Sequence, residues 1–308
     1  MDKNATIFIV GHDDVIERSL RGFFRDKGFQ VFSSSEMGMD TSIQASVYAF
    51  FQDERPDYIF LGSSRSGGIA ANLNQPAEFI YHNLASQTNV IHAAHKFGSK
   101  KLLYFASSCV YPKDAAQPLK PDLFLTGPME STSEAYSIAK AAGIKLCQSY
   151  QKQYQFSAIV TLPATVYGPG CDTDLATAHV MGALIAKFVA AKKSGAKDVT
   201  VWGSGKPRRE FLYVDDFLRA VELLMNEYNG TDIINVGVGE DIAIKELAEL
   251  IADVTEYEGA VRYDSSKPDG VFQKLLDSSV LNGMGFKPQV SLKEGVAKTI
   301  EWYRSGNF

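Results

Sequence analysis

Cysteine is scarce in this sequence, with only Cys109, Cys147 and Cys171 among 308 residues. An odd and widely spaced set of three argues against a disulfide framework and against a zinc site. No apolar run approaches the roughly 20 residues that a membrane-spanning helix needs. The first residues, Met1 to Asn4, lack the basic region and the cleavage site of a signal peptide. We therefore expect a cytoplasmic protein without a metal ion and without a membrane partner.

An excess of positive charge is also missing. Lys and Arg number 31 against 36 Asp and Glu, which gives a formal net charge of −5, and no run of Lys or Arg exceeds two residues. Nucleic acid and anionic membrane surfaces are therefore poor candidates for partners. The hydrophobic content of 45% is that of an ordinary folded protein rather than of a disordered chain.

Short apolar runs alternate with helical patterns over the first half of the chain. Such repeats of strand, helix and strand predict a parallel sheet covered by helices. The expected strands are residues 6–10, 30–32, 58–61, 101–106 and 158–162, and the expected helices between them are 15–27, 42–51, 76–97 and 134–154. With a sixth strand supplied from later in the chain, this pattern predicts a Rossmann-type, doubly wound α/β fold.

After residue 163 the pattern loosens into loops and separate helices, expected at 178–193, 214–226, 244–254 and 292–302. We expect a dinucleotide-binding domain over residues 1–165, with a returning segment near 198–225, and a smaller substrate domain over residues 166–308. Ligands of open parallel sheets bind at the carboxyl ends of the strands. The side chains that carry function should therefore follow the strands directly.

The turn after the first strand departs from the glycine-rich pattern of dinucleotide-binding folds. Gly11 stands where the first glycine belongs, but Asp14 and Glu17 occupy the next two glycine positions, with Asp13 beside them. Glycines let the backbone approach a cofactor diphosphate at a helix N-terminus, whereas carboxylates repel it. Acidic residues at a helix start can also simply complement the helix dipole. Neither interpretation restores a phosphate site, and residues 33–36 offer no Arg or Lys for a 2′-phosphate.

Ser, Tyr and Lys residues in the middle of the chain point to carbonyl chemistry. Ser107 follows the strand at 101–106, and Tyr136 and Lys140 lie one turn apart on the helix at 134–154. A Lys cation near a phenol lowers the pKa of the phenol, so that Tyr can exchange a proton with a substrate oxygen. A second Tyr-x-x-x-Lys, at Tyr263 and Lys267, is followed at once by proline and does not indicate a helix.

With these motifs the chain resembles the extended short-chain dehydrogenase/reductase family, and within it the GDP-4-keto-6-deoxy-mannose 3,5-epimerase/4-reductases. The resemblance extends over nearly the whole chain. The matching segments are SSCVYP at 107–112, YSIAK at 136–140, YGP at 167–169, VWGSG at 201–205, PRREFL at 207–212 and SKPDG at 266–270.

The resemblance implies a role for each site residue. Ser107 and Tyr136 would hydrogen-bond the C4 oxygen of a GDP-4-keto-6-deoxy sugar, and Lys140 would tune the Tyr and hold the nicotinamide ribose while NADPH or NADH reduces C4. Cys109 and His179 would be the acid and base of C3/C5 epimerisation, for which a thiol and an imidazole have suitable pKa values.

The same resemblance implies the residues around the ligands. Those expected at the cofactor, which is NADP or NAD, are Gly11, His12, Ser63, Tyr136, Lys140 and Pro163. Those expected at the GDP-sugar substrate are Ser108, Lys187, Trp202, Arg209, Lys267 and Asp269. A homodimer formed through the helices at 76–97 and 134–154 is expected on the same basis.

The sequence leaves three functions open. The leading one is an NAD(P)-dependent enzyme that performs C3/C5 epimerisation, C4 reduction or both. One alternative is an epimerase that keeps Cys109 and His179 but no longer uses NADPH, and another is a non-catalytic nucleotide-sugar-binding subunit. Retention of all five groups, Ser107, Cys109, Tyr136, Lys140 and His179, speaks against the last, because a subunit without chemistry has no physical need for them.

Overall fold

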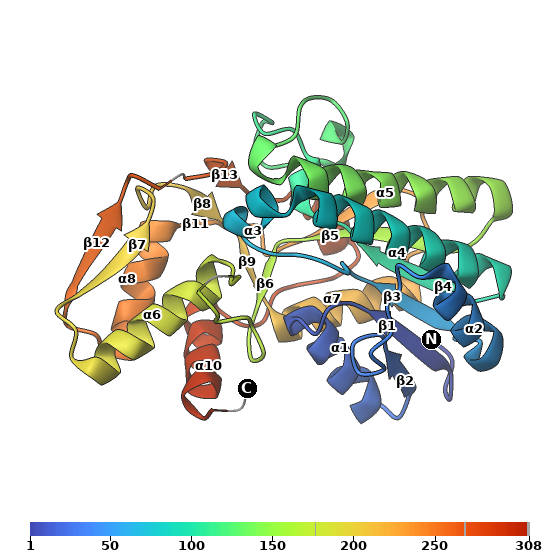
Figure 1. The fold of residues 1–308 in the computed structure, drawn as a ribbon, viewed down its shortest axis with the longest axis horizontal. Helices are drawn as coiled ribbons and strands as arrows, with labels where there is room; N and C mark the ends of the chain where they lie inside the picture. The colour runs from blue at the N-terminus through green and yellow to red at the C-terminus, as the bar shows by residue number, and fades with distance from the viewer. Residues whose placement is uncertain (176, 268, 307–308) are drawn as a thin grey trace.

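A six-stranded parallel sheet forms the centre of the described chain (Figure 1). The computed structural model describes residues 1–175, 177–267 and 269–306. In spatial order the strands are β10 (Ile233–Val236), β5 (Ala158–Pro163), β4 (Lys101–Phe105), β3 (Tyr58–Leu61), β1 (Thr6–Val10) and β2 (Gln30–Ser33). Every neighbouring pair is parallel. The predicted Rossmann-type, doubly wound fold is therefore confirmed.

Helices cover both faces of this sheet, which explains why its strands are apolar almost without interruption. On β1, Ile7 and Ile9 belong to the same buried cluster as Phe24 of the helix that follows. The intervening Phe8 points to the opposite face, where its ring lies 4.3 Å from the ring of Phe50, centroid to centroid. Alternate residues of one strand thus stabilise two separate layers of helices.

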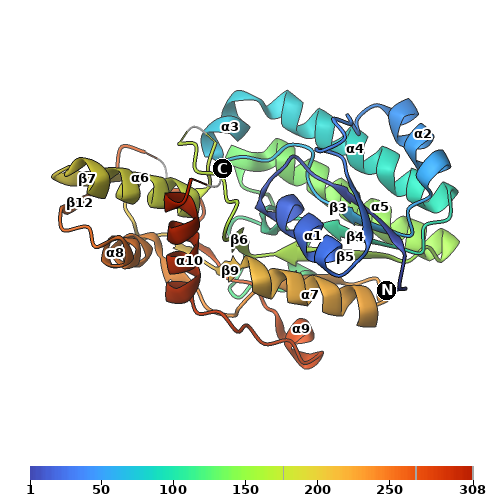
Figure 2. The same ribbon diagram turned by 90° about the horizontal axis from the view of Figure 1, so that it is seen from below.

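The layers are seen most clearly when Figures 1 and 2 are compared. One face of the sheet carries α1 (Val15–Asp26) and α7 (Val214–Glu227), and the other carries α2 (Gln44–Glu54), α4 (Pro76–Lys96) and α5 (Glu134–Tyr154). These bounds lie within three residues of those predicted from the sequence. The helix α3 (Ile69–Asn74) was not predicted.

The sixth strand of the sheet is β10, which comes from later in the chain. The part of residues 198–225 that packs on the sheet is the helix α7. The strand β7 (Asp198–Trp202) pairs instead with β12 (Ala260–Asp264). After β5 the chain therefore leaves the sheet for a second, smaller part of the molecule, returns with α7 and β10 to complete the sheet, and then leaves again.

The smaller part lies beyond the carboxyl ends of the sheet strands (Figure 1). Its helices are α6 (Val180–Ser194), α8 (Ile244–Thr255) and α10 (Leu292–Arg304), with α9 (Ser279–Gly283) on the connection between the parts. Its other strands are β6 (Thr165–Tyr167), β9 (Phe211–Tyr213), β8 (Arg208–Arg209), β11 (Ile242–Ala243) and β13 (Gln273–Lys274). Across the described residues, none of the helices has both the length and the apolar character that crossing a membrane requires.

A buried carboxylate, Glu210, ties these crossings together. It is 2% exposed and accepts hydrogen bonds from the backbone N–H groups of Val238, Gly239 and Leu276, at 2.7, 2.7 and 2.9 Å. Burial raises the pKa of Glu210, although these three bonds oppose the shift. Glu210 therefore fixes the exit of β10 and the chain after β13 relative to the strand pair β8 and β9.

Candidate active site

The predicted cofactor residues and Ser107 gather at the carboxyl edge of the parallel sheet. Gly11 and His12 follow β1, Ser63 follows β3, Ser107 follows β4 and Pro163 ends β5. Tyr136 and Lys140 reach the same edge from the first turns of α5. This edge is where an open α/β sheet binds its ligands.

Tyr136 and Lys140 lie one turn apart, but the ammonium group of the Lys is directed at a backbone carbonyl. Lys140 Nζ donates a hydrogen bond to Phe105 O at 2.8 Å and lies 5.9 Å from the centroid of the Tyr136 ring. The phenol oxygen of Tyr136 lies 3.0 Å from Ser63 Oγ. The pair shares a face of the helix, as predicted, without direct contact between the charge and the phenol oxygen.

Burial controls the protonation of both side chains. Lys140 is 1% exposed, and its burial lowers its pKa to about 7. Burial also raises the pKa of Tyr136, a shift that hydrogen bonds with Ser63 and Ser107 oppose. Burial, rather than the charge of Lys140, therefore dominates the pKa of Tyr136 in this conformation. Tyr136 is protonated at neutral pH and can donate a hydrogen bond to a substrate oxygen.

Cys109 sits in a short 3₁₀ turn, Ser108–Val110, that directly follows Ser107. Its sulfur lies 3.3 Å from Lys274 Nζ. Burial raises the pKa of the Cys109 thiol, but the charge of Lys274 and hydrogen bonds with Ser107, Lys274 and Ser133 outweigh this, so the pKa lies below its ordinary value. A thiol with a lowered pKa supplies the thiolate, which is the competent base.

Lys274, which contacts the candidate catalytic thiol, was not predicted from the sequence. It lies on the two-residue strand β13, which pairs in parallel with β8. It is 165 positions from Cys109 in the chain. A two-residue strand leaves no periodic pattern, and no motif marks this Lys. The SKPDG segment a few residues before it was the nearest available signal.

His179 is the residue directly before α6, and it lies within range of the charge of Lys274, the residue that contacts Cys109. More than a third of its surface is accessible to solvent. Partial desolvation lowers the pKa of His179, while the charges of Asp14 and Asp172 oppose the shift and that of Lys274 supports it. The imidazole is therefore neutral at neutral pH and can accept a proton.

Two lysines flank the exposed ring of Trp202, a residue that is 59% exposed at the end of β7. Lys187 Nζ and Lys267 Nζ lie 5.6 and 5.5 Å from the ring centroid. Lys187 also donates a hydrogen bond to Thr200 O at 2.9 Å, and its partial burial lowers its pKa. The structure thus brings three of the predicted substrate residues together into one cationic, aromatic patch.

The other predicted substrate residues lie in two further places. Asp269 accepts hydrogen bonds from the backbone N–H and the hydroxyl of Ser204, at 2.7 and 2.8 Å, and so holds its own loop. Arg209 lies nearer the Cys109 thiol: its burial lowers its pKa, and Cys109 and Asp269 oppose that shift. Ser108 lines a shallow hollow together with Cys109 and Lys274.

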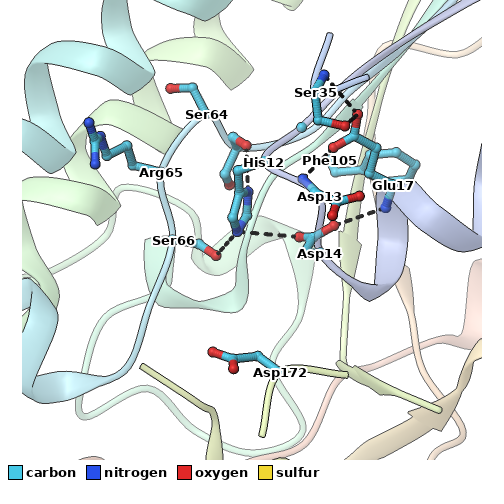
Figure 3. Close-up of polar contacts among 12 residues, drawn as sticks. His12, Asp13, Asp14, Glu17, Ser35, Ser64, Arg65, Ser66, Phe105 and Asp172 are labelled. Atoms are coloured by element: carbon cyan, nitrogen blue, oxygen red, sulfur yellow. Dashed lines mark hydrogen bonds and ion pairs between the residues drawn. The ribbon is translucent and has the colours of Figure 1, made fainter. Parts of the chain in front are cut away.

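The turn after β1 is filled by its own carboxylates (Figure 3). Asp14 Oδ1 caps the helix α1 by accepting from the Glu17 N–H at 2.9 Å, and the Glu17 carboxylate turns back to accept from the Asp13 N–H at 2.5 Å. His12 Nδ1 lies 2.9 Å from Ser63 O, and its Nε2 lies 2.9 Å from Ser66 Oγ. His12 therefore carries its proton on Nδ1, because a carbonyl oxygen can only accept.

Comparison with known proteins agrees with this geometry. Residues 24–237 match the model of the NAD dependent epimerase/dehydratase family. GDP-L-fucose synthase 1 of Arabidopsis thaliana is 44% identical over 303 residues, which cover 98% of this chain and 94% of the relative. A GDP-6-OMe-4-keto-L-xylo-heptose reductase from Campylobacter jejuni superposes with a TM-score of 0.94 at 30% identity, over 100% and 99% of the two chains. A GDP-mannoheptose C4 reductase from the same organism, solved with NADP bound, superposes with a TM-score of 0.90 at 31% identity, over 99% of each.

The fold and the Ser, Tyr and Lys residues at the sheet edge define an enzyme of the extended short-chain dehydrogenase/reductase class. Within that class, the chain belongs to the NAD dependent epimerase/dehydratase family. Its curated relatives include GDP-L-fucose synthases from plants and bacteria.

The contact between Lys274 and Cys109 predicts the reactivity of the thiol. In a Lys274→Met variant the cation that favours the thiolate is lost, so the pKa of Cys109 should rise. Alkylation by iodoacetamide at pH 7 should then slow by about tenfold for each unit of the rise. The rate should be measured against pH by mass spectrometry of the Cys109 peptide.

Lys267→Met is the matched control, because Lys267 lies against Trp202 and not against the thiol. Cys147 and Cys171 are buried, which keeps them from competing for the reagent. An alkylation profile that is the same in Lys274→Met and in the unmodified protein would show that Lys274 does not tune Cys109.

Proposed function

We propose that this chain is a nucleotide-sugar enzyme of the GDP-L-fucose synthase type, which acts on a GDP-4-keto-6-deoxy-hexose. The step that its own side chains supply is proton exchange at C3 and C5, the carbons on either side of the ketone. The observation that carries the proposal is the Cys109 thiol, which lies 3.3 Å from Lys274 Nζ. Cys109 is also close enough to Tyr136, and Lys274 to His179, for their charges to interact.

A hydrogen on a carbon next to a ketone is removed as a proton when the resulting enolate is stabilised. Tyr136 is protonated and, with Ser107, offers hydroxyl donors at the sheet edge to the C4 oxygen. Donors directed at the oxygen on which negative charge develops contribute strongly to such reactions. Tyr136 and Ser107 therefore have a role in proton exchange as well as in carbonyl reduction.

Cys109 and His179 are the groups that move the protons. The thiolate favoured by Lys274 accepts a proton from the carbon. His179, which is neutral at rest, takes up a proton from solvent and returns it to the carbon. Because burial lowers its pKa, His179 is a stronger acid once it is protonated than an ordinary imidazole. No oxidant or reductant enters this step, since the carbon loses one proton and gains another.

The nucleotide end of the substrate is assigned to the patch of Lys187, Trp202 and Lys267. Two ammonium groups beside an exposed aromatic ring suit a diphosphate attached to a nucleoside. Arg209, whose guanidinium is near the Cys109 side of the cleft, would then bind the part of the substrate between the diphosphate and the sugar.

Reduction of C4 requires a nicotinamide cofactor, which supplies the hydride when bound. Of the residues proposed to hold it, Ser63 follows β3, Pro163 ends β5, and Tyr136 and Lys140 lie on the first turns of α5. The residues of the first turn do not fit a dinucleotide, however, because the Glu17 carboxylate occupies the position in front of Gly11. Proton exchange is therefore the chemistry that the side chains of this cleft support.

We further propose a homodimer formed through α4 and α5. The two helices pack side by side, and Tyr81 on α4 and Tyr154 on α5 are 62% and 48% exposed. Burial of such rings in an interface is favourable. Light scattering should give twice the chain mass of 33.8 kDa, and the mass of a single chain at micromolar concentration would contradict this proposal.

The central test is hydrogen exchange in D₂O. GDP-4-keto-6-deoxy-mannose incubated with the purified protein should take up deuterium at C3 and C5, as followed by NMR. A Cys109→Ser variant should exchange roughly 10²–10⁴-fold more slowly, because the base is lost. Cys171→Ala, which removes a buried thiol elsewhere, should retain the full rate. Exchange that is absent from the unmodified protein would refute the proposed function.

The nucleotide patch is tested by fluorescence. GDP should quench the emission of Trp202, and Lys187→Met should weaken GDP binding roughly 3–10-fold, the worth of one partly exposed charged contact. Lys193→Met, on the exposed side of the same helix, is the matched control. Trp302→Phe should leave the quenching intact, and quenching that survives Trp202→Phe would place the nucleotide elsewhere.

A further inference from the structure

We infer that Glu17 closes the site at which this fold binds a dinucleotide diphosphate, so that the chain exchanges protons on its substrate without binding NADPH or NADH. The keto sugar that it produces must then be consumed by a separate nicotinamide-dependent reductase. The proton exchange rests on the proposed function, whereas the closure of the cofactor site rests on the contacts that Glu17 makes.

The position of Glu17 is the first reason. A Cβ atom placed on Gly11 would lie 2.8 Å from Glu17 Oε2, so the carboxylate rests directly against the bare backbone of Gly11. In a glycine-rich turn that open backbone is the surface which the diphosphate approaches. The Glu17 side chain is 1% exposed, so it already fills the space that a diphosphate would need next to Gly11.

The hydrogen-bond donors of the turn are the second reason. The Asp13 N–H and the hydroxyls of Ser33 and Ser35 all donate to the Glu17 carboxylate, at 2.5, 2.5 and 2.6 Å. The N–H of Glu17 itself donates to Asp14. These are groups at a helix N-terminus and at the next strand end that would otherwise meet a phosphate or a ribose. An internal carboxylate thus takes the place of the external anion.

The charge of the turn is the third reason. Asp13, Asp14 and Glu17 bring three carboxylates to the position of the diphosphate (Figure 3). Arg18 lies 2.8 Å from Asp13, which lowers the pKa of that carboxyl and keeps it ionised. A diphosphate in the turn would therefore meet like charge where the fold normally offers a positive helix end.

The neighbouring arginines do not supply a substitute site. Arg21 and Arg25 both pair with Glu36, at 3.0 and 2.6 Å, at the end of β2 where a 2′-phosphate would need a cation. Arg65 is exposed, and Figure 3 shows its side chain directed away from the turn. The basic residues around this edge are thus engaged elsewhere or point outward.

The substrate end of the cleft differs from the first turn, because it keeps every group that proton exchange needs. Tyr136 remains protonated, and the Cys109 thiol retains Lys274. Lys140, which would hold a nicotinamide ribose, donates to Phe105 O. One half of the cleft is therefore equipped for chemistry while the other half is closed to the cofactor.

The direct experiment is calorimetry of the unmodified protein with NADPH and with NADH. We expect no binding up to millimolar cofactor, no loss of absorbance at 340 nm with substrate, and a rate of deuterium uptake that NADPH leaves unchanged. The NADP-binding C4 reductase from Campylobacter jejuni serves as the positive control for the titration. Saturable binding at micromolar cofactor, or consumption of NADPH with the substrate, would overturn the inference.

A gain-of-function variant tests whether these particular side chains close the site. Asp14→Gly combined with Glu17→Gly restores the glycine spacing and frees the Asp13 N–H and two serine hydroxyls. NADPH should then bind saturably at concentrations at least tenfold below the millimolar limit at which the unmodified protein shows no binding. Asp26→Gly, which removes an exposed carboxylate from the other end of α1, should bind no cofactor. Circular dichroism should accompany the titration, because the double change removes a helix cap.

The outcomes separate this inference from the proposed function. A folded double variant that still fails to bind NADPH would show that Glu17 and Asp14 are not the barrier, which overturns the inference. If the double variant does not fold, calorimetry of the unmodified protein decides alone. Absence of deuterium uptake by a protein that also binds no cofactor would refute the proposed function and leave the closure of the cofactor site confirmed.

Discussion

All the chemistry of this protein depends on one constraint, the common carboxyl edge of parallel strands. Because β1, β3, β4 and β5 run in the same direction, residues that are far apart in the chain leave the sheet at the same place. Backbone groups at that edge have no partners within the sheet, and the first N–H groups of the helix α1 point to the same edge. These polar groups need hydrogen-bond partners, which are either a bound ligand or side chains of the protein itself.

Two ends of this edge satisfy that requirement in opposite ways. Next to Cys109, Lys274 on the distant strand β13 provides a positive charge. This charge lowers the pKa of the thiol and so favours the thiolate. In the turn after β1, the carboxylate of Glu17 on α1 accepts the hydrogen bonds that the Asp13 N–H and the Ser33 hydroxyl donate. Under the inference drawn above, a fold shared with an NADP-binding relative would keep its proposed proton-transfer groups and lose its phosphate site through side chains alone. The separation is possible because the two groups of contacts share no residue.

The retained Ser107, Tyr136 and Lys140 fit this division. A hydroxyl directed at a carbonyl oxygen stabilises an enolate as well as an alkoxide, so Tyr136 would serve proton exchange whether or not hydride is transferred. Lys140 is fully buried against Phe105 O and the ring of Tyr104, 4.8 Å from its centroid. Lys140 therefore also has a structural role, because it joins α5 to β4 through these contacts.

The sequence by itself determined the parallel α/β fold, the bounds of elements such as α5 and β3, and the residue types at the strand ends, because hydrophobic periodicity is a local property of the chain. It also showed that the first turn carries Asp14 and Glu17 in place of glycines. Only the tertiary structure decided that Glu17 folds back onto Gly11, that Lys274 reaches Cys109, that β10 completes the sheet, and that burial raises the pKa of Tyr136. Each of these depends on residues brought together from distant positions, and on the desolvation that only packing produces.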